Sequence, residues 1–187
     1  MQSPTCFIAF PFGERRYDNT KIMGDVEVVT STSEENHHAA NRFAVVKEVP
    51  LGYDGPIKTG DILLVHHNVF KFYNDISGKR RSGKSHLWEE LFLIDDDQFF
   101  MYKQDDKWHP HNRYCFVKPV PPEESSIFRP TSEEPLMGVM KYPNEYLLKE
   151  GVVEGTKVSF TPDSEYEFTV DGEKLYRMYD HQIAFSL

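Results

Sequence analysis

The second half of this 187-residue chain repeats the first half. Residues 91–100 (LFLIDDDQFF) align without a gap with residues 175–184 (LYRMYDHQIA), 84 positions later. The spacing between partner blocks differs from pair to pair, as expected if loops change in length and strands do not. The repeat predicts two copies of one small domain rather than a solenoid of short units. The other paired blocks, in the same order in both halves, are 6–8 with 115–117, 44–47 with 138–141, and 57–65 with 152–160.

The repeat also suggests where the domains begin and end. We predict a first domain over residues 1–107 and a second over residues 113–187, joined by a linker at residues 108–112. With 39% hydrophobic residues, the chain has enough apolar side chains for compact cores. Domains this small commonly gain stability by packing against each other or by forming oligomers.

Charge and hydropathy narrow the choice of partners. The net charge of −9 argues against nucleic acid or an anionic membrane surface as the main partner. The sequence has no apolar run of membrane-spanning length, and its N-terminus lacks a basic region followed by an apolar core. We therefore expect a soluble, cytoplasmic protein that binds neither nucleic acid nor a membrane.

Short apolar runs separated by turn residues predict strands along almost the whole chain. Glycine and proline mark the turn at 51–56, and Asp171-Gly172 is a two-residue hairpin signal. No segment has the sustained 3.6-residue period of a capped helix. We therefore predict an all-β protein made of small barrels or sandwiches. The predicted strands include 5–10, 26–29, 42–49, 62–65, 114–118, 137–142 and 158–161.

The order of these blocks, found twice, resembles the GroES-like co-chaperonin family. Each copy has an opening strand, a long polar segment, a second strand, a glycine turn before a third strand, and a final hydrophobic strand. The resemblance covers nearly the whole chain and rests on the order of individually weak motifs. The matching blocks are 45–49, 57–65 and 91–101 in the first copy, and 138–140, 153–160, 170–176 and 180–185 in the second.

This resemblance implies a fold and a function. Each copy would be a partly open, five-stranded β-barrel, and the chains would form a homo-oligomeric ring that caps the folding cavity of a chaperonin. In this family, a hydrophobic tripeptide in the long loop docks on the apical domains of the ATP-bound chaperonin. The matching segments here are 25–41, with Val26, Val28 and Val29, and 123–134, with Ile127 and Phe128. The chaperonin supplies the ATPase, so no catalytic residue or cofactor is expected in this chain.

Other interpretations of the same residues remain open. Val26 to Val29 fits a paired strand with its apolar face in the core, and Phe128 fits a side chain packed on its own barrel. The tandem barrels also suit a structural or assembly protein, possibly of a virion, that no longer binds a chaperonin.

A second alternative rests on residues 78–85 (GKRRSGKS), which match the phosphate-binding pattern G-x-x-x-x-G-K-S. That pattern binds nucleotides only when a strand precedes it and a helix follows, because the helix N-terminus and loop amides hold the phosphates. The sequence after Ser85 reaches the repeat's strand within a few residues. We therefore predict a basic loop insertion at 77–86, and a helix after Ser85 would be needed for a nucleotide-binding protein.

The histidines and cysteines do not suggest a metal site. His66 and His67 are adjacent on a predicted strand and should point to opposite faces. No spacing of cysteine and histidine matches a zinc site. Cys6 and Cys115 each lie in the opening strand of a copy, where we expect buried free thiols, with a disulfide between the copies as the alternative.

Overall fold

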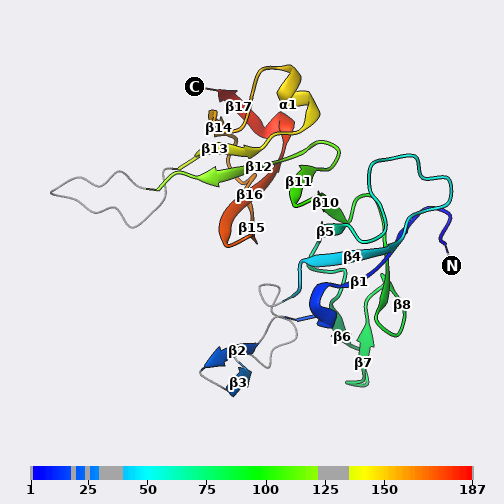
Figure 1. Cartoon of the computed structure of the whole chain (residues 1–187). Coiled ribbons are helices and arrows are strands. Elements are labelled where there is room, and N and C mark those ends of the chain that lie inside the picture. The colour runs from blue at the N-terminus through cyan, green and yellow to red at the C-terminus, as the bar shows by residue number, and fades with distance from the viewer. Residues whose placement is uncertain (1, 18–19, 24–25, 30–39, 122–134, 187) are drawn as a thin grey trace. The chain divides into compact units, whose positions relative to one another are not determined.

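The computed structural model describes residues 2–17, 20–23, 26–29, 40–121 and 135–186, and its chain is mostly antiparallel β-strand (Figure 1). The prediction of an all-β protein is confirmed. The chain divides into two compact units, Met1–Lys107 and Trp108–Leu187, which we call unit 1 and unit 2. In the described part of the chain, no helix is long and apolar enough to cross a membrane.

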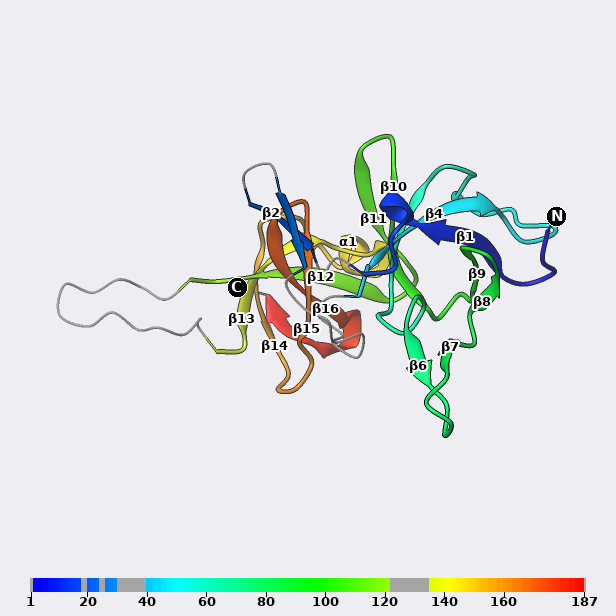
Figure 2. The same ribbon diagram turned by 90° about the horizontal axis from the view of Figure 1, so that it is seen from below.

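The first sheet has seven strands in the order β11-β10-β5-β4-β1-β9-β8, and all of them lie in unit 1 except β11, which begins at Lys107 and continues into unit 2. Two further ribbons, β2–β3 and β6–β7, each consist of two strands. Figures 1 and 2 show that the β6–β7 hairpin projects from the larger sheet. The strands are β1 (Phe7–Pro11), β2 (Thr20–Met23), β3 (Val26–Val29), β4 (Phe43–Glu48), β5 (Ile62–Val65), β6 (Phe72–Asn74), β7 (Arg80–Ser82), β8 (His86–Trp88), β9 (Leu91–Ile94), β10 (Phe99–Gln104) and β11 (Lys107–Pro110), with a 3-10 turn at Phe12–Glu14.

Unit 2 is built on a six-stranded sheet with the order β15-β16-β12-β13-β14-β17. The α-helix α1 (Glu145–Lys149) is capped by Asn144, whose side chain accepts a hydrogen bond from the Leu147 amide. A one-turn helix is too short to show a helical period in the sequence, which is why it was not predicted. The strands are β12 (Tyr114–Pro119), β13 (Met137–Tyr142), β14 (Lys157–Phe160), β15 (Tyr166–Val170), β16 (Glu173–Tyr179) and β17 (Ile183–Ser186), with a 3-10 turn at Asp180–Gln182.

The two sheets share one strand order. Read from one edge, β8-β9-β1-β4-β5-β10 in unit 1 corresponds strand for strand to β15-β16-β12-β13-β14-β17 in unit 2. Both units also have a register shift between the first two long strands, at Ile8/Ala9 and at Phe116/Val117. A β-bulge re-aims the side chains that follow it, so its presence in both units shows that they agree in detail as well as in topology.

The strand pairing corrects one block of the sequence alignment. Phe7 pairs with Ile94, and Cys115 pairs with Met178. Ile94 and Met178 are partners in the gap-free alignment of 91–100 with 175–184, so Phe7 is the counterpart of Cys115, and the alignment of Cys6 with Cys115 is off by one. A shift of one residue in a strand moves a side chain to the other face. Accordingly, Phe7 and Cys115 are both buried, whereas Cys6 is only partly buried.

Each unit has its own hydrophobic core, and the two cores use equivalent positions. Burying one valine, leucine, isoleucine, phenylalanine or methionine side chain stabilises the fold by about 1.5–3 kcal/mol. The blocks that repeat in the sequence therefore supply the paired positions, while Val69 and Phe70 of the unit 1 core lie between β5 and β8, and Leu147 of the unit 2 core lies in α1. The paired core positions are Phe7 with Cys115, Ala9 with Val117, Val46 with Met140, Ile57 with Val152, Leu63 with Val158, Val65 with Phe160, and Ile94 with Met178.

Equivalent glycine turns lead into the third strand of each unit. Gly60 and Gly155 have φ angles of 95° and 89°, a region that side-chain-bearing residues rarely occupy. Their amides donate hydrogen bonds of 2.8 Å to the carbonyls of Val46 and Met140. In both units, this bond ties the turn to the neighbouring strand.

Two features differ from the sequence predictions. The segment 108–112, predicted as a linker, begins inside β11, because the Asp105-Asp106 turn has positive φ at both residues and so reverses the chain as hairpin turns do. In addition, neither large sheet closes on itself among the described residues.

Candidate functional site

The first predicted docking segment forms a separate β-ribbon. Val26 pairs with Met23, Val28 with Lys21, and Val29 with Thr20. Among the described residues, β2 and β3 pair only with each other and with no strand of the seven-stranded sheet. Val26 to Val29 is therefore a paired strand, as the alternative interpretation had it, but it belongs to a ribbon of its own. The other predicted docking residues, Ile127 and Phe128, lie outside the described residues.

The two chain segments that lead to this ribbon are held together at its root. Tyr17 forms a β-bridge with Ala40, and the Asn41 amide donates to the Arg16 carbonyl over 2.9 Å. The Asn41 side chain donates to the carbonyls of Phe12 and Arg15, at 2.8 and 2.7 Å, and accepts from the Phe43 amide at 2.9 Å. One asparagine thus joins both sides of the root, which we define as residues 12–17 and 40–43.

The side chain of Arg16, at the root, donates four hydrogen bonds. Its Nε and Nη2 donate to the two carboxylate oxygens of Glu90, at 2.7 and 3.1 Å. Nη1 donates to Ser82 Oγ at 2.9 Å, and Nη2 also donates to the Glu89 carbonyl at 3.1 Å. The side chain is 8% exposed. A planar guanidinium suits this set of acceptors, because its donors form a fixed fork that a lysine cannot reproduce.

Aromatic rings complete the surroundings of Arg16. Its guanidinium carbon lies 4.3 Å from the ring centre of Phe72 and 4.7 Å from that of Phe92. The neighbouring Tyr17 stacks on Phe72, and its hydroxyl accepts a 2.9 Å hydrogen bond from the Phe72 amide. Phe72 and Ser82 both belong to the β6–β7 hairpin. The root is therefore bonded to that hairpin by two consecutive residues.

The β6–β7 hairpin is an insertion in unit 1. Residues 66–85 connect β5 to β8, whereas residues 161–165 connect the equivalent strands β14 and β15. The basic segment predicted as an insertion, 77–86, is thus the second half of a longer one. Five of its twenty residues are lysine or arginine and one is acidic, although the whole chain has a net charge of −9.

The residues of the phosphate-loop pattern at 78–85 do not have the nucleotide-binding geometry, and two of them make structural contacts. Ser85 is followed by strand β8, so the helix that the motif requires does not form. The glycine of GKS, Gly83, packs against the Lys71 carbonyl, where an added Cβ would lie only 3.2 Å from the oxygen. Ser85 Oγ accepts a hydrogen bond of 3.2 Å from Gln98. The nucleotide-binding interpretation is wrong for this segment.

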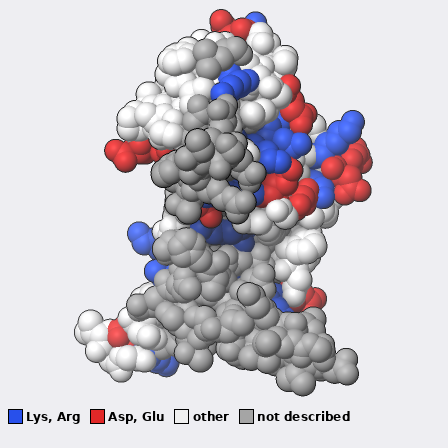
Figure 3. Space-filling model, turned by 90° about the vertical axis from the view of Figure 1, so that its left-hand side faces the viewer, with Lys and Arg blue, Asp and Glu red and all other residues white. Residues whose placement is uncertain are grey.

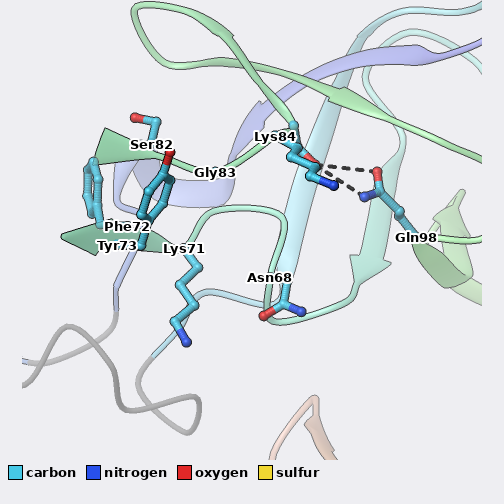
Figure 4. A pocket seen from close by; sticks show the side chains of 9 residues that line it. Asn68, Lys71, Phe72, Tyr73, Ser82, Gly83, Lys84 and Gln98 are labelled. Carbon is cyan, nitrogen blue, oxygen red and sulfur yellow. Dashed lines mark hydrogen bonds between the residues drawn. The ribbon is translucent and has the colours of Figure 1, made fainter. Parts of the chain in front are cut away.

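A shallow hollow of about 710 Å³ lies beside the insertion (Figure 4). Figure 4 shows the ammonium groups of Lys71 and Lys84 pointing in different directions. They do not converge on a single point, as they would have to do to hold a phosphate. The other residues around the hollow are Asn68, Phe72, Tyr73, Ser82, Gly83, Ser85 and Gln98.

The paired histidines are arranged differently from the prediction. Strand β5 ends at Val65, so His66 and His67 lie in a turn, where the alternation of a strand does not apply. Their ring centres are 4.1 Å apart, on the same side rather than on opposite faces. Within the described ranges, no group of three or more histidine, cysteine, aspartate or glutamate residues is placed to hold a metal ion.

The two cysteines are free and differ in their surroundings. The thiol of Cys6 donates to an Asp95 carboxylate oxygen over 3.0 Å. Cys115 is fully buried in the core of unit 2, and this burial raises the pKa of its thiol to about 12. The expectation of buried free thiols therefore holds for Cys115, while Cys6 is partly exposed.

The charged side chains form a mixed surface. On the face shown in Figure 3, lysine and arginine side chains lie beside aspartate and glutamate side chains. Several of them form ion pairs, such as Lys118 with Glu173 at 2.9 Å and Lys141 with Glu154 at 2.9 Å.

No protein-family model matches this sequence, and no curated protein matches it significantly. Function is therefore inferred from the repeated fold and from the connections that leave its sheets.

Proposed function

We propose that this chain is a tandem GroES-like co-chaperonin that caps the folding cavity of an ATP-bound chaperonin. The observation that carries this proposal is the strand order shared by the two units, with a long connection at the same place in each. That place lies between β1 and β4 in unit 1, and between β12 and β13 in unit 2. The resemblance seen in the sequence assigns docking on the chaperonin to these connections.

The fold suits two docking segments. β1 pairs with β4, and β12 pairs with β13, so each connection begins and ends at neighbouring strands. A segment whose two ends are tied to neighbouring strands can contact a partner without disturbing the core. Such a segment loses conformational entropy when it docks, so each one binds weakly. Several in a homo-oligomeric ring then act together through multivalency.

In this proposal, each unit is a partly open barrel of the co-chaperonin family, and the chain has no catalytic site of its own. The docking side chains are Val26, Val28 and Val29 on β3, together with Ile127 and Phe128 in the second connection. The chaperonin's own ATPase provides the energy for release of the lid.

The test is formation of a complex between the purified chain and a chaperonin, with and without ATP. We expect a complex that depends on ATP. We also expect Val28→Ser and the double variant Ile127→Ser/Phe128→Ser each to weaken it by about tenfold or more, since each removes apolar contact at every subunit of a ring.

Matched controls come from exposed apolar residues elsewhere in the chain. Val153→Ser and Ile76→Ser remove side chains that are 51% and 107% exposed, respectively, and neither lies in a connection that we assign to docking. Both controls should bind as the unchanged chain does. A chain that forms no complex with any chaperonin would refute the proposal and favour a structural or assembly role. Equal binding by the docking variants and the controls would refute the assigned residues.

A further inference from the structure

We propose that the inserted β6–β7 hairpin anchors the root of the first docking segment, with Arg16 as the positioning residue. This inference rests on the proposed function for its purpose, but the anchoring itself follows from contacts within unit 1. The hairpin occurs only in unit 1, at the place where five residues connect the equivalent strands of unit 2. It therefore serves something that unit 1 does and the shared fold does not require.

The contacts show what the hairpin holds. Arg16 reaches Ser82 on β7, the ring of Phe72 on β6, and Glu90 in the turn between β8 and β9. The sequence separations from Arg16 to Ser82 and Glu90 are 66 and 74 residues. One guanidinium thus joins three segments that are distant in the sequence. Tyr17 adds a second tie to the hairpin, through its stacking on Phe72 and its hydroxyl.

The insertion's own composition supports this function. Ser82 and Gly83 belong to the segment that imitates a phosphate loop, and their positions are explained by the anchor. Ser82 Oγ accepts from Arg16, and Gly83 allows β7 to come close to the Lys71 carbonyl. Arg81, in contrast, bonds to Asp75 within the same hairpin. The hairpin is therefore stabilised internally at its outer end and bonded to the root at its inner end.

A fixed root changes the energetics of docking. Part of the conformational freedom that a docking segment would lose on binding is already removed in the free protein. The two chain segments that lead to the β2–β3 ribbon then start from fixed points at Tyr17 and Ala40, although among the described residues the ribbon's strands pair with no other sheet. Loosening the root should weaken docking without removing any side chain that touches the partner.

The experiment measures amide hydrogen exchange in the full chain carrying Arg16→Lys. Lysine keeps the positive charge but cannot bond Glu90, Ser82 and the Glu89 carbonyl together. We expect exchange of the Asn41 amide, which donates to the Arg16 carbonyl, to become about tenfold faster. The Val46 and Gly60 amides, in the core sheet of unit 1 and its glycine turn, should exchange at the unchanged rate. Arg81→Lys, which alters an arginine of the same hairpin, is the matched control and should leave Asn41 unaffected.

Tyr17→Phe provides a milder variant. It removes the hydroxyl that accepts from the Phe72 amide and keeps the stacked ring. If Arg16→Lys also accelerates exchange at Val46, the whole unit has been destabilised. In that case Tyr17→Phe becomes the test of anchoring, and Asn41 should exchange faster in it while Val46 does not. Unchanged exchange of Asn41 in both variants would overturn the anchoring.

Chaperonin binding separates this inference from the proposed function. If the unchanged chain forms no complex, the proposed function fails, and the exchange rates still decide whether Arg16 anchors the root. If the unchanged chain binds, Arg16→Lys should weaken the complex by about tenfold, while Arg81→Lys does not. A loosened root with unweakened binding would overturn the claim that anchoring serves docking.

Discussion

Gly138 and Val117 are packed so closely that neither side chain can grow. An added Cβ at Gly138 would overlap Val117 Cγ1 and would lie 2.9 Å from the Lys118 carbonyl oxygen. The counterparts in unit 1 are Ala44 and Ala9, both fully buried. One unit therefore has two small side chains where the other has a larger one and a glycine. The space between these strands is filled in both units, but it is divided differently.

The substitution Gly138→Ala should lower the free energy of unfolding by about 1–3 kcal/mol, because an overfilled site forces the neighbouring strand to shift. Val117→Ala in the same chain should recover part of this loss, with a coupling of about 1 kcal/mol. Denaturant titrations of the two single variants and the double variant measure both quantities. Strictly additive effects would contradict the packing described here.

The carboxylate of Asp180 gives unit 2 a defined sensitivity to acid. Its side chain is 1% exposed and accepts hydrogen bonds from Arg113 at 2.6 Å and from Asn144 at 3.0 Å. Burial alone would raise the pKa of Asp180, but these bonds outweigh burial and leave the pKa below its ordinary value. The stability gained from this lowered pKa is therefore present above the unfolded pKa, about 4, and is lost as pH falls through the lower folded value.

In Asp180→Asn, we expect a smaller loss of stability between neutral pH and about pH 3, because the titrating group has been removed. At neutral pH, Asp180→Ala should cost about 1–3 kcal/mol, since the Asn144 amide loses its partner in a buried site. Thermal unfolding measured across this pH range tests both expectations. The same slope with pH in Asp180→Asn and in the unchanged chain would rule out Asp180 as a source of acid sensitivity.

The thiols provide a third test at the residue scale. Because burial raises the pKa of Cys115 to about 12, its thiol should be almost entirely protonated at pH 8 and shielded from reagents. Cys6 is partly exposed. We expect a soluble thiol reagent to label Cys6 at least about tenfold faster than Cys115 in the folded chain, with equal rates after denaturation. Labelling followed by peptide mapping distinguishes the two sites.

At the scale of elements, the glycine turns before β5 and β14 have matching geometry. Nothing lies within 4 Å of an added Cβ at Gly60 or Gly155, so a side chain there would meet no neighbour. The cost of a substitution comes from the backbone alone, through the positive φ.

We therefore expect Gly60→Ala and Gly155→Ala to destabilise their units by similar amounts, about 1–2 kcal/mol each. Denaturant unfolding of the two variants provides the comparison. Markedly unequal losses would show that the two turns are not equivalent, despite their matching hydrogen bonds.

The strands and turns also show which parts of this structure could be predicted from the sequence. The ten-residue block at 91–100 and 175–184 and the glycine turns were identified because a strand keeps its length and a positive φ favours glycine. The three-residue block that pairs Cys6 with Cys115 was misaligned, because a shared letter in so short a match does not set the register. Only the pairing with Ile94 and Met178 did so.

The anchor at Arg16 could not have been predicted in the same way. Arg16 is one of 21 basic residues, and its partners lie 66 and 74 positions away with no local pattern to connect them. The phosphate-loop pattern lies in the inserted segment that contacts Arg16, but the pattern alone does not distinguish a nucleotide-binding loop from a hairpin. That distinction depends on the element after Ser85, which is strand β8. The predicted strand at Val26 to Val29 formed, and its pairing with β2 followed from neither propensity nor the repeat.

In the molecule as a whole, each unit has a hydrophobic core of its own, and seven positions of the two cores are equivalent. Two-state behaviour is expected of single small domains, and a chain with two cores need not unfold in one step. The free energy of unfolding should therefore be measured for each unit separately.

We expect Gly138→Ala to lower the melting of unit 2 and leave that of unit 1 in place. Hydrogen exchange followed during thermal unfolding reports on the two units separately, through the equivalent amides of Val46 and Met140. If both amides lose protection together in the variant, the units unfold as one cooperative block.

The exchange of size between Ala9/Ala44 and Val117/Gly138 has a consequence for building hybrids of the two units. A chimera that carries β13 in place of β4 would set Gly138 against Ala9 and leave a gap, and the reverse graft would press Ala44 against Val117. Moving β12 and β13 together keeps the matched sizes. The smallest segment that can be exchanged between the units is thus a pair of strands. If the units arose by duplication of one domain, these two positions would have had to change together.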